Sequence, residues 1–159
     1  MILTRLTLAL LLAAPALAAP GAAPPPARYT FARAELRGCA DGDTCTFDLH
    51  ETHPVFGTVT WRGHTVRFFG VDAPELHPAR CEAERELGER AKARVVALLT
   101  GAATVSIEIV GRRRDKYGRL LGRVLADGRD VGALLIAEGL GRPYSGRGTR
   151  RTWCPAEAH

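Results

Sequence analysis

The hydrophobic pattern changes its period along the chain, and this change limits the possible folds. Before Pro74 the apolar residues mostly follow the alternation of strands, and between Cys81 and Gly101 they recur at about every fourth residue. The second spacing predicts an amphipathic helix whose apolar stripe packs on a sheet. Alternation returns over residues 105–109, and residues 120–125 form a further strand. The sequence therefore predicts a mainly β protein with helices, of the α+β class.

Turn signals divide the strand-like regions into hairpins. Strands over residues 34–40 and 45–49 flank an Asp-Gly-Asp-Thr turn, and strands over residues 58–61 and 64–71 flank Arg62-Gly63. After the Asp127-Gly128 turn, Asp130 is placed to cap a short helix over residues 131–138, which Gly139 ends. Short strands with a helix inserted among them are typical of a small closed barrel, a fold that often binds nucleic acids.

The first 28 residues have the pattern of an export signal and a leader. Residues 1–18 combine Arg5 with an apolar run and end in Ala16-Leu17-Ala18, the small-x-small pattern of a signal-peptidase site. That run is shorter than the about 20 residues of a transmembrane helix, and we expect no stable membrane insertion after cleavage. Residues 19–28, rich in proline and alanine, predict a poorly ordered leader to one domain over residues 29–159. We expect an exported protein, periplasmic or secreted.

The cysteines form an even set: Cys39, Cys45, Cys81 and Cys154. In a chain bound for an oxidising compartment, this favours disulfides over free thiols, and three pairings are possible. Cys39 and Cys45 could face each other across a hairpin, which would leave Cys81 to join Cys154. A zinc site is the alternative, but the cysteines are scattered and include no C-x-x-C pair.

The formal net charge of +5 favours a polyanion or an anionic surface as partner. Basic residues concentrate in one turn and near the C-terminus, at Arg112, Arg113, Arg114, Lys116 and Arg119, and at Arg142, Arg147, Arg150 and Arg151. For the C-terminal group, a solvated charge run is an equal alternative.

Carboxylates and arginines recur around the predicted strand ends. The stretch VRFFGVDAPE over residues 66–75 begins beside Arg67 and ends with Asp72 and Glu75; Asp43 lies upstream of it and Arg119 downstream. Hard cations such as calcium take oxygen ligands, and the planar guanidinium suits phosphate. The combination suggests a metal-assisted phosphodiesterase.

In their order, the DGDT turn, VRFFGVDAPE and DKYGR resemble the staphylococcal nuclease (thermonuclease-like) family over roughly residues 37–144. The resemblance implies a five-stranded OB-type β-barrel with one longer and one short packed helix, and calcium-dependent hydrolysis of DNA and RNA. Matched by position, it implies carboxylate ligands to calcium from Asp43 and Asp72, a main-chain carbonyl ligand from Ala73, phosphate contacts from Arg67 and Arg119, and a base at Glu75.

Other residues are candidates for substrate contact. Lys116 and Tyr117 lie beside Arg119 in sequence and could touch a terminal phosphate. Tyr144 either stacks on a base or packs against the barrel mouth.

The chain departs from the family pattern at several places. Ala73 stands where threonine is frequent, and an insertion covers residues 50–56. Its His50 and His53 are expected on a loop, as surface residues rather than metal ligands. The C-terminal helix of the family is missing or shortened, and a Cys81–Cys154 bond could compensate.

The sequence thus predicts an exported, disulfide-bonded, calcium-dependent endonuclease, expected to be a monomer. Its substrate would be DNA or RNA, preferably single-stranded or flexible, with little sequence preference because no base-edge readers can be identified. The alternative is a noncatalytic OB-type nucleic-acid-binding module. A third class, binding of acidic polymers or lipid headgroups through the arginine-rich terminus, would not require the acidic turns.

Overall fold

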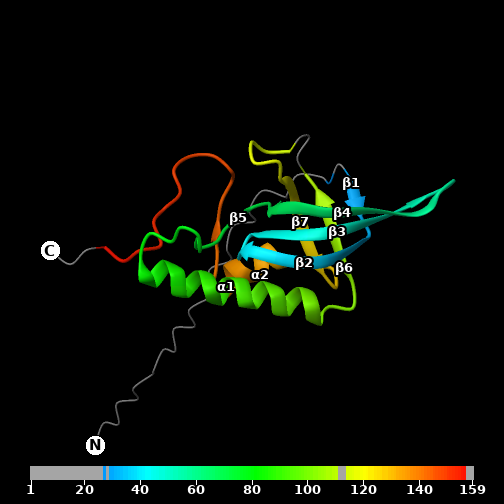
Figure 1. Cartoon of the computed structure of the whole chain (residues 1–159). Helices are drawn as coiled ribbons and strands as arrows, with labels where there is room; N and C mark the ends of the chain where they lie inside the picture. The colour runs from blue at the N-terminus through cyan, green and yellow to red at the C-terminus, as the bar shows by residue number, and fades with distance from the viewer. Residues whose placement is uncertain (1–26, 28, 111–113, 157–159) are drawn as a thin grey trace, which may run out of the picture.

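A computed structural model describes residues 27, 29–110 and 114–156 (Figure 1). The predicted signal peptide, nearly all of the predicted leader, and Arg112 and Arg113 of the basic turn lie outside these ranges. None of the helices described combines the length and hydrophobicity needed to cross a membrane.

The described residues form nine strands and two helices. In chain order these are β1 (Tyr29–Phe31), β2 (Arg33–Asp41), β3 (Thr44–His53), β4 (Gly57–Phe68), β5 (Val71–Asp72), α1 (Glu82–Gly101), β6 (Val105–Ile109), β7 (Leu120–Ala126), β8 (Arg129–Asp130), α2 (Val131–Ala137) and β9 (Arg142–Pro143).

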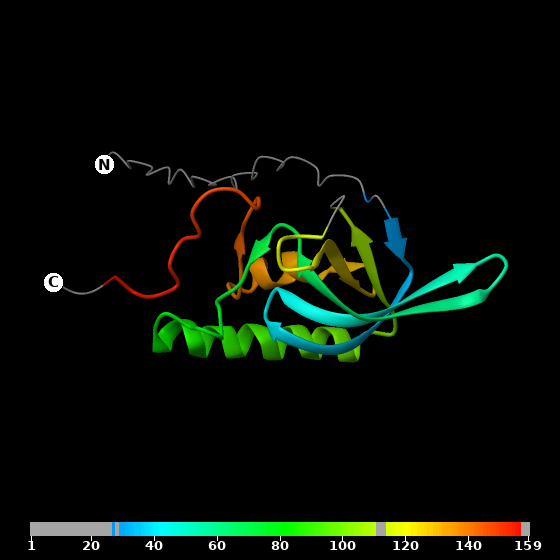
Figure 2. The same ribbon diagram turned by 45° about the horizontal axis from the view of Figure 1, so that its top comes forward.

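The main sheet has the strand order β1-β6-β7-β4-β3-β2, with β8 paired to β7 outside this path. Neighbours are antiparallel except β4 and β7, which are parallel. The sheet curls so that β2 lies near β6, and α1 runs along one side (Figures 1 and 2). The mainly β, OB-like class is therefore confirmed. The expected closure is wrong, because no ladder joins β2 to β6 within the described ranges and the sheet stays open.

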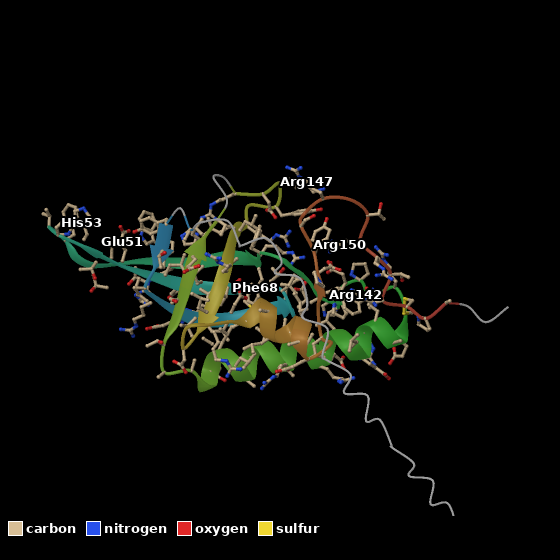
Figure 3. The ribbon with its side chains drawn as sticks, turned by 180° about the vertical axis from the view of Figure 1, so that it is seen from behind. Glu51, His53, Phe68, Arg142, Arg147 and Arg150 are labelled. Atoms are coloured by element: carbon tan, nitrogen blue, oxygen red, sulfur yellow. A yellow bond between two sulfur atoms is a disulfide. The ribbon has the colours of Figure 1, made fainter. Side chains whose placement is uncertain are left out.

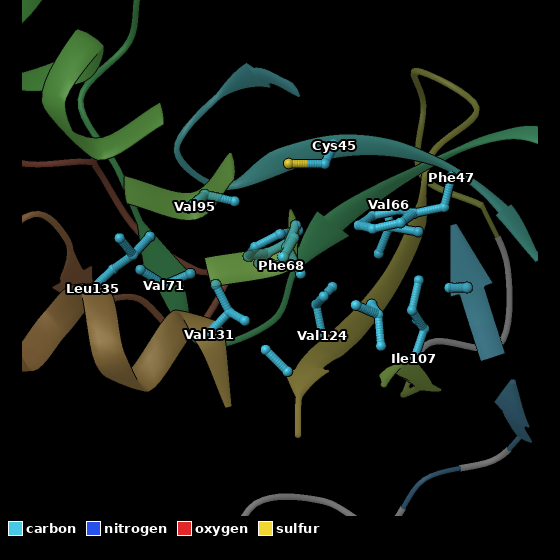
Figure 4. Packing of buried hydrophobic residues seen from close by; sticks show 14 of the residues in the cluster. Cys45, Phe47, Val66, Phe68, Val71, Val95, Ile107, Val124, Val131 and Leu135 are labelled. Carbon is cyan, nitrogen blue, oxygen red and sulfur yellow. The ribbon is translucent and has the colours of Figure 1, made fainter. Parts of the chain in front are cut away.

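A single hydrophobic core fills the concave side of the sheet. Phe47, Val66 and Ile107 come from three strands, and Val95 of α1 and Leu135 of α2 complete the same cluster (Figure 4). All five side chains are fully buried. The strand residues reach this face because they follow the two-residue alternation of a half-buried sheet.

The second predicted hairpin is wrong. Arg62-Gly63 is not a turn but a bulge within the continuous strand β4, where Asp48 alone of β3 faces both residues. Gly63 has a φ of +67°, which occurs both in some turns and in some bulges, and its N–H donates to Asp48 Oδ1 at 2.9 Å. The predicted strand over residues 64–71 also ends earlier, at Phe68, and β5 begins after a short turn.

The insertion over residues 50–56 is a loop only at residues 54–56, since residues 50–53 belong to β3. It extends β3 and the beginning of β4 into a two-stranded arm that projects from the body (Figure 2). His50 lies in β3, where its Nδ1 is 3.0 Å from Thr60 Oγ1, and the ring of His53 stacks on Phe56 at 4.7 Å.

Both helices occur where the sequence predicts them. Asp130 caps α2, since its Oδ1 accepts a hydrogen bond from Ala133 N–H at 3.1 Å. Cys81 precedes α1 and is bonded to Cys154, while Cys39 is bonded to Cys45, so the favoured disulfide pairing is confirmed.

Candidate active site

The predicted site residues from the first half of the chain meet at one end of the sheet. Asp43 lies in the turn between β2 and β3, and Arg67 lies near the end of β4, opposite Thr44 in the ladder. Phe68 N–H donates to the carbonyl of Asp43 at 2.8 Å, which fixes the turn to β4. Asp72 ends the short strand β5.

Asp43 and Arg67 form a buried ion pair. Arg67 Nη1 lies 2.7 Å from Asp43 Oδ1, and both residues are buried. Asp43 also accepts hydrogen bonds from Ala73 N–H at 2.7 Å and from the Thr44 hydroxyl at 3.0 Å. Burial raises the pKa of the Asp43 carboxyl, and the charge of Arg67 opposes this shift. The pair is thus held rigidly before any ligand arrives.

Asp72 is buried beside the same guanidinium, and one of its carboxylate oxygens accepts no hydrogen bond of normal geometry among the described residues. Its Oδ1 lies 3.6 Å from Arg67 Nη2 and 3.2 Å from Arg150 Nε. These are ion-pair distances, yet this oxygen has no hydrogen-bond partner of normal geometry among the described residues. A buried carboxylate oxygen in this condition is suited to accept a cation.

Arg119 is held by the turn that contains it. Its Nε donates to Asp115 Oδ2 at 2.8 Å, and Asp115 Oδ1 accepts the N–H groups of Tyr117 at 2.9 Å and of Arg119 at 3.0 Å. These bonds lower the pKa of Asp115 against the raising effect of burial. The guanidinium also reaches Thr44 Oγ1 at 3.4 Å, next to Asp43.

Lys116 and Tyr117 occupy the outer side of this turn. The Tyr117 ring is exposed and lies 4.9 Å from the Lys116 ammonium and 5.1 Å from the Arg119 guanidinium.

A pocket of about 270 Å³ joins these groups. We call it the arginine pocket; its lining includes residues 68–71 and Arg67, Lys116, Tyr117, Arg119, Tyr144 and Arg150. Asp43 and Asp72 lie behind this lining, in contact with Arg67. A larger hollow of about 450 Å³, between β2 and the end of α1, contains none of the predicted site residues.

Glu75 is the most exposed of the predicted acidic residues, with 39% of its side chain accessible. Its Oε1 accepts from Arg150 Nη1 at 2.5 Å. Sequence reasoning did not place Arg150 in the site, but grouped it with the C-terminal basic residues. The favoured Cys81–Cys154 pairing could have predicted this position of Arg150, because the bond brings the residues just before Cys154 close to those just before Cys81.

The donor set can be compared with the needs of calcium. No three His, Cys, Asp or Glu side chains converge in the part of the chain that the structure describes. Asp43 and Asp72 supply hard oxygens, and calcium completes such a shell with main-chain carbonyls and water. Asp72 Oδ1, which accepts no hydrogen bond of normal geometry, fits this chemistry. Ala73 follows Asp72 directly, and its N–H donates to Asp43 Oδ2 at 2.7 Å. The residues therefore fit calcium with few protein ligands.

A family model described as "Staphylococcal nuclease homologue" matches residues 65–153, more than half of the chain. The match covers the ends of β4 and β5, the Arg119 turn and the segment that carries Arg150. Asp43 lies before it.

Curated relatives from Bacillus subtilis (strain 168) carry endonuclease names. Endonuclease YhcR is 32% identical over 109 residues, which are 65% of this chain and 8% of that protein. SPbeta prophage-derived endonuclease YokF is 40% identical over 87 residues, 53% of this chain and 29% of that protein. Endonuclease YncB is 42% identical over 79 residues, 49% of this chain and 36% of that protein. The matched part of the chain thus covers between 8% and 36% of the length of these relatives.

Proposed function

The chain belongs to the staphylococcal nuclease homologue family, and from this premise we propose that it is a calcium-dependent endonuclease acting on DNA or RNA. The observation that supports this most is the arrangement of Asp43 and Asp72 around the buried Arg67, next to a pocket lined by further cations. A phosphodiester is an anion, and its hydrolysis needs cations that are already in place.

The arginines would stabilise the charge that develops on the nonbridging phosphate oxygens. Arg67 and Arg119 are fixed by Asp43 and Asp115, so little reorganisation is needed when the reaction occurs. Their planar forks suit two-point contact with phosphate better than the ammonium of lysine. Lys116 would add a more mobile charge at the outer side of the pocket.

Asp43, Asp72 and the carbonyl of Ala73 would hold calcium. When bound, the ion would supply positive charge at the phosphate and make a neighbouring water more acidic. Glu75 would orient the attacking water or accept its proton, as a partly exposed carboxylate at the edge of the site. Because a carboxylate is a weak base, most of the acceleration would come from the cations.

Aromatic rings favour a flexible substrate. The exposed Tyr117 ring and the half-buried Tyr144 both line the arginine pocket. Rings of this kind stack on any base, and phosphate contacts carry no sequence information, so we propose little sequence preference and action on single-stranded regions.

The same proposal includes export as a monomer. The signal-like residues 1–18 support export to the periplasm or outside the cell. Two disulfides are typical of proteins that fold in an oxidising compartment.

The test is hydrolysis of single-stranded DNA by the oxidised protein without its predicted signal peptide, with calcium and with a chelator, followed over time on a gel. We expect cleavage with calcium and none with the chelator. Binding without cleavage under both conditions, and also with manganese or magnesium, would instead favour the noncatalytic binding module.

A further inference from the structure

The segment that carries Arg150 is fixed at both ends. We call residues 144–154 the C-terminal strap. It begins where Tyr144 N–H donates to Gly70 O at 3.0 Å, directly after β9, which pairs with β5. It ends at Cys154, which is bonded to Cys81. The strap therefore cannot leave the region of the site without breaking one of these connections.

Internal contacts hold the course of the strap between these points. Arg142 Nη1 donates to Thr152 O at 2.8 Å, and its guanidinium lies 3.7 Å from the Trp153 ring. Gly146 and Gly148 have φ values of +81° and +83°, which L side chains rarely adopt, so the chain can turn there. Figure 3 shows Arg147 and Arg150 on this segment, at the opposite end of the molecule from His53 on the arm.

Arg150 bridges two carboxylates of the candidate site. Its Nε lies 3.2 Å from Asp72 Oδ1, and its Nη1 lies 2.5 Å from Glu75 Oε1. The guanidinium stays charged, because the two carboxylates raise the pKa of Arg150 against the lowering effect of burial. It also lines the arginine pocket and lies 5.6 Å from the Tyr144 ring.

Arg150 and a metal ion would compete for the same oxygen. Asp72 Oδ1 faces two guanidiniums, of which Arg67 is buried and paired with Asp43 at 2.7 Å. Arg150 is the one that can move, because 34% of its side chain is exposed and it ends a long flexible stem. A cation that binds Asp72 would repel both, and Arg150 is the less buried of the two.

We propose that Arg150 is an internal counter-ion of Asp72 and Glu75. A divalent cation displaces its guanidinium, which then contacts the substrate phosphate. The proposal rests on the proposed calcium dependence and adds to it a residue that links the metal to the substrate. A phosphate in the pocket would give the displaced guanidinium a new partner. Calcium and substrate should therefore bind cooperatively, with equal coupling in both directions.

Calorimetric titration of calcium chloride into the oxidised protein tests the first step. Arg150→Gln should bind calcium about fivefold more tightly than the wild type, the size expected for loss of one partly exposed ion pair. Arg151→Gln is the matched control, since Arg151 is an exposed neighbour of the same charge, and its affinity should stay at the wild-type value. Arg150→Lys should restore most of the wild-type affinity.

Thymidine monophosphate as a probe tests the second step. In the wild type and in Arg151→Gln, the probe should tighten calcium binding, and in Arg150→Gln this tightening should be clearly smaller, because only the direct attraction between calcium and phosphate remains. Thermal unfolding of each variant checks that the fold is intact.

The failures are distinguishable. Equal calcium affinity in the wild type and Arg150→Gln would overturn the proposal. An equal rise in calcium affinity in Arg150→Gln and Arg151→Gln would also overturn it, because it would indicate a general charge effect. If calcium-dependent cleavage persists in those cases, the proposed function stands alone. Tighter calcium binding by Arg150→Gln in a protein that cleaves no DNA would support the counter-ion and contradict the nuclease. No calcium binding by any variant would overturn both.

Discussion

Arg67 and Arg119 carry the same charge, but the fold holds them differently. Arg67 is buried against Asp43, whereas Arg119 and its partner Asp115 are partly exposed. Arg67→Ala would leave the Asp43 carboxylate buried and unpaired, so we expect the free energy of unfolding to fall by about 3 kcal/mol or more. Arg119→Ala should cost less than about 1 kcal/mol. Denaturant unfolding measures both values.

Hydrolysis should slow in both variants, because each loses a phosphate contact. Equal destabilisation of the two would contradict the difference in burial. An unchanged rate in Arg119→Ala would remove that residue from the mechanism.

Glu75 is expected to act on the reaction rather than on binding. Glu75→Gln keeps the shape of the side chain and an oxygen for Arg150, but it cannot accept a proton. We expect kcat to fall by about 100-fold or more while substrate affinity stays constant. Single-turnover cleavage and a separate binding titration measure the two quantities. Glu86→Gln, at an exposed position of α1, should change neither, and an unchanged kcat in Glu75→Gln would exclude Glu75 as the base.

At the scale of the elements, the carboxylate of Asp48 connects β3 to the bulge in β4. Asp48 is buried in β3 and accepts from the N–H of Gly63 at the bulge and from the Arg37 guanidinium. The hydrogen bond from Arg37, and next that from Gly63, lower the pKa of Asp48 from 3.8 to about 2. A carboxyl whose pKa is lowered by folding stabilises the fold at a pH above its pKa in the unfolded chain. It loses this contribution as the pH falls through its pKa in the folded protein.

The pH dependence of stability follows from this sign. Near neutral pH, Asp48→Asn should be less stable than the wild type. The difference should shrink as the pH falls from about 4 to about 2, because the wild-type carboxyl then becomes protonated as well. Thermal unfolding of both proteins across this range measures the difference, and a gap that stays constant would exclude Asp48 as the titrating group.

Local patterns predicted most elements but not how they join. The helical repeat located α1, and the capping residue Asp130 located α2. Arg62-Gly63 was misread because a positive φ at glycine serves a turn and a bulge equally well, and only the pairing with β3 separates the two. The same pairing extends through the arm, where the ladder of β3 and β4 continues from the pair of Leu49 and Trp61 to the pair of His53 and Gly57.

The candidate site was predictable where neighbouring residues in sequence carry it. Asp43, Arg67, Asp72 and Arg119 lie in short motifs next to strand ends, and the structure brings them together. Arg150 belongs to no such motif. It reaches Glu75 through the disulfide and the pairing of β9 with β5, contacts between distant parts of the chain that no local pattern encodes.

At the scale of the whole molecule, the two disulfides should differ in their effect on stability. Cys81 and Cys154 are 73 residues apart, and Cys39 and Cys45 are 6 apart. Restricting the unfolded chain is worth more for the longer loop, about 4 kcal/mol against about 2 kcal/mol. Replacing each pair by alanine and measuring denaturant unfolding should give losses in that order. A larger loss for the short loop would indicate that the packing of the buried Cys45 dominates.

The long disulfide also has a consequence for proteolysis. A protease that cuts the backbone once between Cys81 and Cys154, for example near the exposed Tyr117, would leave two fragments joined by a covalent bond. The fragment with Asp72 and Glu75 would keep the fragment with Arg150 attached to it. On a gel, the nicked protein should run as one band until a reductant is added.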